Sequence, residues 1–225
     1  MLRLQIATAI LLACTAPAAW AQADAPDHVW PDSLNTARDA SYLTDVEREV
    51  IHELNKVRSN PPAYARRLKA ERSSYDGKLI RRPGAVDILT TEGVRALDEC
   101  IAALERAQPL PLLHPSECLS QASRLLARDQ SSSGKTGHSG SDGSTMTSRI
   151  EKYCGKRHTA TAENISYGYS QAQAIVYQLL IDDAVASRGH RKNIMNDAYN
   201  SCGCATASHS RYGWLCVMDF GFLKI

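Results

Sequence analysis

Apolar residues recur at helical spacing along most of this chain. Thr44 and Glu47 predict a capping box at the start of one helix. The apolar stripe that follows consists of Val46, Val50, Ile51, Leu54 and Val57. Its three- and four-residue steps are those of an amphipathic helix with one buried face. Similar stripes predict helices over residues 91–106, 116–130 and 171–183, and Ser144 favours the start of a short helix over residues 144–153.

The last third of the chain adds strands. Residues 162–167, 201–206 and 214–222 favour strands, and the last two flank a loop that predicts a hairpin. Strands that follow one another through a hairpin pair antiparallel, and amphipathic helices need a surface to cover. We therefore predict an α+β fold with helices over a small antiparallel sheet.

The first 21 residues are typical of a signal peptide. Arg3 precedes an uncharged, mostly apolar stretch over residues 4–18, which is too short for a stable membrane anchor. Ala19-Trp20-Ala21 then places small residues where a signal peptidase checks them. We expect cleavage after Ala21, a secreted or periplasmic protein without a transmembrane segment, and a flexible polar leader over residues 22–43.

An alternative processing site lies at Cys14, because Leu11-Leu12-Ala13-Cys14 resembles the site at which lipoproteins are lipidated. The chain has seven cysteines, and removing Cys14 with the signal peptide leaves six. An even number suits a disulfide framework in an oxidising compartment. The formal net charge is only +2, with no block of like charge, so nothing indicates nucleic-acid binding.

Three short segments contain residues suited to site chemistry. They are Gly137-His138-Ser139-Gly140, Ala162-Glu163-Asn164-Ile165 and Arg188-Gly189-His190-Arg191. Each has an ordinary structural explanation when taken alone, because a histidine in a glycine-rich loop is usually solvent-exposed and a glutamate beside a strand usually forms an ion pair.

In their residues and in their order along the chain, these segments resemble motifs of the CAP superfamily of cysteine-rich secretory, antigen 5 and pathogenesis-related proteins. Its domain is also called the SCP-like extracellular domain. The early run Leu54-Asn55-Lys56-Val57-Arg58-Ser59-Asn60-Pro61, followed by Tyr64-Ala65, is similar to the first-helix signature of that family. The late run Cys216-Val217-Met218-Asp219-Phe220 is similar to its last strand. The resemblance covers residues 44–225 and implies an α-β-α sandwich, with a small antiparallel sheet between helical layers.

The resemblance also implies a cleft of two histidines and two acidic residues. His138, Glu163 and His190 match three of these positions. For the second acid the chain offers Asp182 or Asp183, and continuing the helical stripe of residues 171–183 favours Asp183. The chain lacks the aromatic-rich continuation after His190 that is common in animal and plant members.

The cleft allows three kinds of function. The first is a non-enzymatic protein that binds a lipid, a small ligand or a protein partner. His138 and His190 would also suit Zn²⁺ or another divalent ion in an open, weak site. The second is a hydrolase or peptidase that uses a His–Glu pair as general base. The third is a structural or interaction protein of the cell envelope in which the cleft is vestigial. No convincing nucleophile lies beside the pair, so the catalytic residues stay unknown, and we expect a monomer.

The cysteines suggest three bridges. If the final hairpin centres on Ser210, Cys204 lies opposite Cys216 within bridging range. Cys202 then needs a partner outside the hairpin, and Cys154 is the best candidate. Cys100 and Cys118 remain as the third pair.

Overall fold

The structure is a computed structural model that describes residues 28–84, 86–156 and 158–223. The α-helices are α1 (Asp45–Ser59), α2 (Pro61–Ala70), α3 (Val94–Arg106), α4 (Glu117–Ser133), α5 (Met146–Cys154), α6 (Ala172–Ile181) and α7 (Gly189–Ile194). The strands are β1 (Tyr75–Asp76), β2 (Leu79–Ile80), β3 (Ile88–Leu89), β4 (His114–Pro115), β5 (His158–Tyr167), β6 (Ser201–His209) and β7 (Gly213–Leu223). Short 3-10 helices lie at Asp32–Leu34 and Glu71–Ser74.

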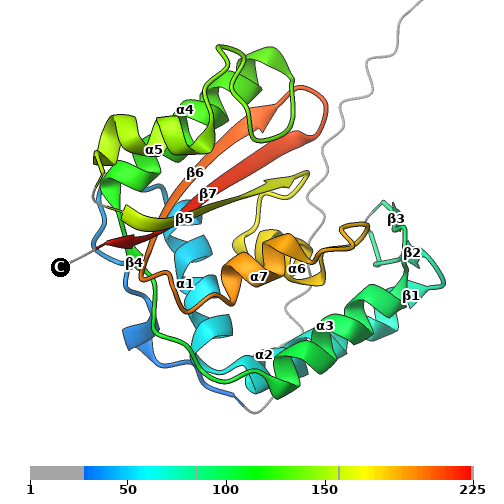
Figure 1. Cartoon of the computed structure of the whole chain (residues 1–225). Coiled ribbons are helices and arrows are strands. Elements are labelled where there is room, and N and C mark those ends of the chain that lie inside the picture. The colour runs from blue at the N-terminus through cyan, green and yellow to red at the C-terminus, as the bar shows by residue number, and fades with distance from the viewer. Residues whose placement is uncertain (1–27, 85, 157, 224–225) are drawn as a thin grey trace, which may run out of the picture.

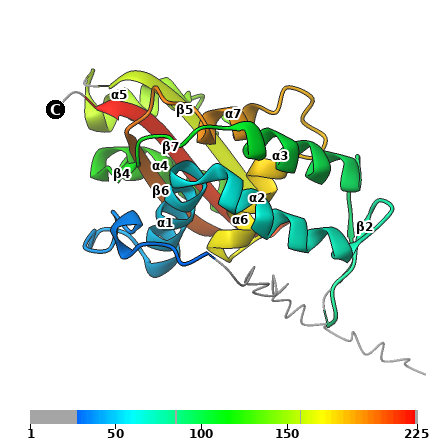
Figure 2. The same cartoon turned by 90° about the horizontal axis from the view of Figure 1, so that it is seen from below.

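One four-stranded sheet divides the molecule into layers. Its strand order is β4-β6-β7-β5, antiparallel except for the short parallel pair of β4 and β6. Helices α4 and α5 cover one face, and α1, α6 and α7 cover the other, with α2 and α3 beyond them (Figures 1 and 2). The predicted α-β-α sandwich is confirmed. A second small sheet, β1-β2-β3, lies beside α2 and α3 at one end.

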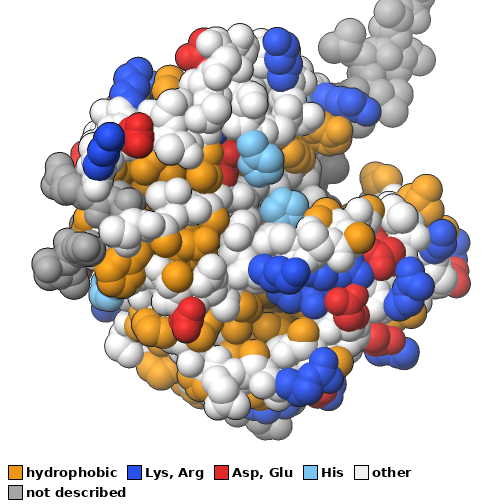
Figure 3. All heavy atoms as spheres, in the orientation of Figure 1, with side chains coloured by type: hydrophobic (Ala, Val, Ile, Leu, Met, Phe, Trp, Pro, Cys, Tyr) orange, Lys and Arg blue, Asp and Glu red, His pale blue; other side chains and the backbone are white. Residues whose placement is uncertain are grey.

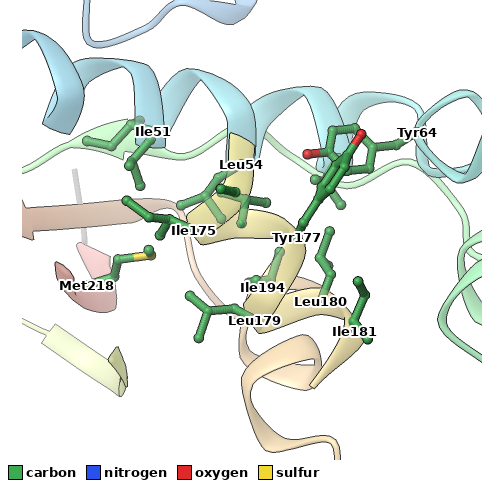
Figure 4. Close-up of a cluster of buried hydrophobic side chains, with 14 of the residues drawn as sticks. Ile51, Leu54, Tyr64, Ile175, Tyr177, Leu179, Leu180, Ile181, Ile194 and Met218 are labelled. Atoms are coloured by element: carbon green, nitrogen blue, oxygen red, sulfur yellow. The ribbon is translucent and has the colours of Figure 1, made fainter. Parts of the chain in front are cut away.

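Helix α1 shows how the apolar stripe produces the core. Thr44 accepts from the Glu47 backbone N–H while the Glu47 carboxylate accepts from the Thr44 backbone N–H, which completes the predicted capping box. Val50, Ile51 and Leu54 of the stripe are fully buried. They pack with α6 and the near face of the sheet, and Figure 4 shows Ile51 and Leu54 facing side chains of α6.

The opposite face of the sheet packs unusually close to α4. A Cβ atom on Gly203 would lie 2.2 Å from the Leu119 carbonyl carbon and from the Ser120 nitrogen. Only glycine leaves room for this approach, and the Ser120 hydroxyl then accepts from the Cys204 backbone N–H at 3.3 Å.

Part of the expected flexible leader, residues 22–43, is packed on the domain. Leu34, Ala37 and Leu43 are buried, and the Asn55 side chain donates to the Leu34 carbonyl at 3.0 Å. These few apolar residues dock the segment despite its polar composition, so the prediction of a flexible leader is wrong over residues 28–43. The predicted signal peptide, its cleavage site after Ala21 and the alternative at Cys14 lie outside the described residues.

The final hairpin turns one residue later than expected. His209 pairs with Gly213, so the turn centres on Arg211 rather than on Ser210. Moving the centre by one residue shifts the register by two, and Cys204 therefore faces Met218 instead of Cys216. The Sγ atoms of Cys204 and Cys216 lie 3.5 Å apart across the diagonal as free thiols.

The disulfide in the structure joins cysteines that were expected to belong to two different pairs. Cys118 on α4 bonds to Cys154 on α5, with their Cα atoms 5.1 Å apart. Cys100 and Cys202 are buried as free thiols in the core on the opposite side of the sheet. The predicted pairs Cys100–Cys118 and Cys154–Cys202 are therefore wrong, because the sheet separates their members.

Within the described residues, no helix combines the length and apolar character needed to cross a membrane.

Candidate functional site

The candidate site is organised around β5, which forms one edge of the main sheet. Successive side chains of a strand point to opposite faces. Glu163 accordingly faces α5 and the loop that carries His138, while Asn164 faces α7, which carries His190. The two histidines thus approach the edge of the sheet from its two sides.

His138 is held by the buried carboxylate of Glu163. The Nδ1 atom of His138 lies 2.8 Å from Glu163 Oε1, and Arg149 donates to Glu163 Oε2 at 2.7 Å. The side chains of Glu163 and Arg149 are each 1% exposed, whereas that of His138 is 58% exposed. The hydrogen bond to Glu163 raises the pKa of His138, although partial burial and Arg149 oppose the shift.

The loop between α4 and α5 is fixed from three sides. Gly137 N–H donates to the Tyr167 hydroxyl at 3.0 Å, and that hydroxyl donates to Gln130 Oε1 at 2.8 Å. Arg149 donates to the His138 carbonyl at 3.1 Å. These contacts preset the backbone around His138, so the imidazole does not depend on a ligand for its position.

His190 is held by Asp182. The Nδ1 atom of His190 lies 2.6 Å from Asp182 Oδ1, and the His190 backbone N–H donates to Asp182 Oδ2 at 2.9 Å. The Asp182 side chain is 1% exposed. On the strand side, the Asn164 amide donates to the His190 carbonyl at 3.0 Å and accepts from Asn193 at 2.8 Å.

Asp182, and not the expected Asp183, is therefore the second acid at the histidines. Helix α6 ends at Ile181, and Asp182 turns into the left-handed region with φ 57°, so the helical phase no longer applies. The Asp183 carboxylate instead accepts from the backbone N–H groups of Thr91 and Glu92, each at 2.7 Å. Asp183 anchors the turn before α3 to the cleft.

Both imidazoles present the same nitrogen to the cleft. Each Nδ1 atom faces a carboxylate, which can only accept, so Nδ1 carries the proton in the neutral ring. Each Nε2 atom is then an acceptor, and within the described residues neither has a hydrogen-bond partner. This carboxylate–histidine arrangement orients a ring toward a ligand or a metal ion.

A cavity of about 390 Å³ opens beside the two histidines. His138, His190, Asp182 and Asp183 contribute to its wall. Figure 3 shows histidine side chains in the hollow of this face. The apolar part of the wall includes Ile80, Ile88, Leu89, Leu179, Ile181 and Val185. The small sheet β1-β2-β3 thus supplies one apolar wall, and α6 supplies another. The two imidazoles and residues of β5 complete the lining.

A second buried carboxyl group lies behind Glu163. Asp219 is the cross-strand neighbour of Glu163, is fully buried, and accepts from the Ser123 hydroxyl at 2.8 Å. Burial, and then the negative charge of Glu163, raise the pKa of Asp219 well above its usual range. The raised pKa favours the neutral form of Asp219, which limits the charge buried beneath His138.

Two predicted chemistries, metal binding and hydrolysis, can be compared with the residues around the cavity. In the described part of the chain, no three His, Cys, Asp or Glu side chains are grouped as a metal site. Thr90 is the one hydroxyl-bearing aliphatic side chain on the described cavity wall, and its hydroxyl donates to the Lys78 carbonyl. The predicted hydrolase and the predicted metal at His138 and His190 stay predictions.

Sequence reasoning missed the residues that support the histidines. Arg149, Gln130, Tyr167 and Asn164 come from α5, α4 and β5, and no local pattern marks them. Asn164 lies beside Glu163 in the segment singled out above, and strand alternation alone places it on the other face.

Residues 51–220 match the model of CAP, the cysteine-rich secretory protein family. The chain belongs to the CAP family. The matched range begins in α1 and ends in β7, so this CAP domain includes both His138 and His190 and most of the main sheet.

Two solved structures are similar to this CAP domain at 20% identity. One is an outer surface protein from Borrelia burgdorferi, with a TM-score of 0.44 over 51% of this chain and 80% of that chain. The other is an extracellular protein containing an SCP domain from Bacillus anthracis, with a TM-score of 0.42 over 50% of this chain and 34% of that one. A comparison with curated proteins finds no match.

Proposed function

We propose that this CAP domain acts by binding a small amphipathic ligand in the cleft beside His138 and His190. The observation that carries the proposal is the division of one cavity of about 390 Å³ into an imidazole end and an apolar wall. Cavities of this size, mostly apolar with few polar groups, are typical of small-molecule sites. A protein partner would need a larger, flatter surface.

The apolar wall provides a direct test. Leu89 lines the cavity and Val86 does not, yet both lie near the β2–β3 turn and both are 76% exposed. Replacing either residue by serine therefore costs little stability. Calorimetric titration with 1-decanol should show weaker binding to Leu89→Ser, by about fivefold, and unchanged binding to Val86→Ser. Equal affinities in the two variants would contradict a ligand on this wall.

A divalent metal ion is a second candidate, favoured by the shared orientation of the imidazoles. His138 Nε2 and His190 Nε2 would supply two ligands, and water or the ligand itself would have to supply the rest, which fits an open and weak site. A bound Zn²⁺ would act as a Lewis acid toward an oxygen atom of the ligand.

Zinc titration can test this second candidate without any activity assay. Affinity should fall in His138→Ala and in His190→Ala, and should fall for the unaltered protein as the pH drops from about 7.5 to about 5.5, because protonated imidazoles cannot coordinate. Affinity that is insensitive to both substitutions and to pH would exclude a metal held by these histidines.

We also propose that the CAP domain is exported. The signal-like first 21 residues and the bond between Cys118 and Cys154 support this, because disulfides persist in oxidising compartments. Intact-mass analysis of the exported protein should show Gln22 as the first residue. A lipidated species that begins at Cys14 would contradict cleavage after Ala21.

A further inference from the structure

We infer that the ligand of this cleft carries a primary ammonium group on an apolar body. The inference rests on the proposed binding function and adds the chemical class of the ligand's polar end. Three features of the cavity support it: the sign of the charges on the wall, the hydrogen-bonding character of the imidazoles, and the aromatic side chains nearby.

The charged side chains of the wall are acidic. Asp182 and Asp183 line the cavity, and no lysine or arginine is among the described residues that do so. The buried cations near the wall are already paired, Arg149 with Glu163 beside His138 and Arg82 with Glu71 near Tyr75 and Tyr169. An anionic head group would therefore lose water beside two carboxylates without gaining a free cation as partner.

The free atoms of the imidazoles are acceptors. Because Glu163 and Asp182 hold the two Nδ1 positions, each ring in its neutral form offers an Nε2 lone pair to the cavity. The complement of two acceptors is a group with several N–H donors. An ammonium group meets this need, and the Asp182 carboxylate behind the His190 ring stabilises its charge. A carboxylate or phosphate would need donors at the same atoms.

Aromatic rings on the wall add a weaker preference for a cationic head group. Tyr75, Tyr167 and Tyr169 line the cavity along with the imidazoles. The faces of tyrosine rings attract cations and repel anions. The apolar body of the ligand would lie against Ile88 and Leu89 of the small sheet, where the wall has no charge.

Three ligands with one chain length and different head groups test the inference. Decylammonium, 1-decanol and decanoate are titrated into the full mature protein at about pH 7.5 with EDTA, below their aggregation limits, and the heat of binding is measured. We expect decylammonium to bind at least about tenfold more tightly than decanoate, with 1-decanol in between. If decanoate or 1-decanol binds most tightly, the ammonium inference is wrong while the proposed cleft function stands. If none of the three binds, both are wrong.

A pair of charge variants locates the effect. Asp183→Asn removes a negative charge from the cavity wall, and Glu151→Gln removes one from an exposed position on α5 that does not line the cavity. Decylammonium should lose about threefold more affinity for Asp183→Asn than 1-decanol loses. Neither ligand should distinguish Glu151→Gln from the unaltered protein. An equal loss in both variants would show a general charge effect and would overturn the assignment to this cleft.

Discussion

At the scale of single residues, two neighbouring carboxylates have different partners. Asp182 holds His190, and Asp183 holds the backbone of Thr91 and Glu92. The difference arises because Asp182 adopts the left-handed conformation that ends α6, which sends the two side chains to different neighbours.

This division predicts two different responses to substitution. In Asp182→Ala, His190 loses the acceptor at Nδ1, so its proton should distribute between the two ring nitrogens, as seen in long-range ¹H–¹⁵N spectra. In Asp183→Ala, the spectrum of His190 should stay unchanged, and the free energy of unfolding should fall by about 1 kcal/mol as the N–H groups before α3 lose their acceptor. A change of tautomer in Asp183→Ala alone would contradict the assignment of Asp182.

Asp219 predicts a pH dependence of stability. Its pKa is raised in the folded protein, above the unfolded value of about 3.9. Below about pH 4 the carboxyl is protonated in both states, and no stability is lost. As the pH rises, the unfolded chain ionises first, so the contribution of Asp219 to the free energy of unfolding falls until the pH reaches the folded pKa.

Replacing this carboxyl by an amide removes that dependence. Between about pH 4.5 and the folded pKa, Asp219→Asn should gain stability over the unaltered protein by about 1.4 kcal/mol per pH unit. Urea unfolding of both proteins at several pH values from about 4.5 to about 7.5 measures the difference. Parallel pH profiles would mean that Asp219 is ionised in the fold.

At the scale of secondary-structure elements, α4 and α5 are joined by the Cys118–Cys154 bond, which closes a loop of 36 residues. Removing it by Cys118→Ala and Cys154→Ala together should lower the free energy of unfolding by about 3–4 kcal/mol, since the unfolded chain gains freedom. The melting temperature should fall by about 10 °C. A reductant should destabilise the unaltered protein by a similar amount.

The hairpin of β6 and β7 still allows a second bridge. Cys204 and Cys216 lie on one face with Sγ atoms 3.5 Å apart, and the hydrogen bond to Cys216, together with burial, raises the pKa of Cys204. Their bond stays a prediction, and non-reducing peptide mapping of the exported protein decides it. Free thiols at both residues would contradict it.

At the scale of the whole molecule, Arg58 connects distant parts of the chain. Its guanidinium is fully buried and donates to the carbonyls of Pro111, Ile194, Asn196 and Tyr199 at 2.8–3.0 Å. The contacts tie α1 to the segment after α3 and to the connection between α7 and β6. Burial lowers the pKa of Arg58 to about 10.

Arg58→Lys keeps the charge but cannot match these acceptors. Several buried carbonyls would lose their donors, and we expect the free energy of unfolding to fall by about 3 kcal/mol in urea unfolding. The same substitution at the exposed Arg106 should change it by less than about 0.5 kcal/mol. Similar small losses at both positions would contradict this role for Arg58.

The sequence by itself determined the elements whose signals are local. The capping box and stripe of α1, the strands around the final turn and the α+β class follow from side chains within one or two helical turns or one strand. The α-β-α layering was implied only by the resemblance to the CAP family. His138, Glu163 and His190 were identified only through the resemblance to the CAP family, because residues in a loop, in β5 and in α7 have no common period.

Only the tertiary structure decided what depends on distance across the sheet. The choice between Asp182 and Asp183 depended on where α6 ends, and the pairing of Cys118 with Cys154 depended on which face each helix covers. The register of the hairpin depended on a single turn residue. In the first and last of these cases packing amplifies a small local difference. A helix that ends two residues earlier, or a turn that moves by one residue, redirects the side chains beyond it.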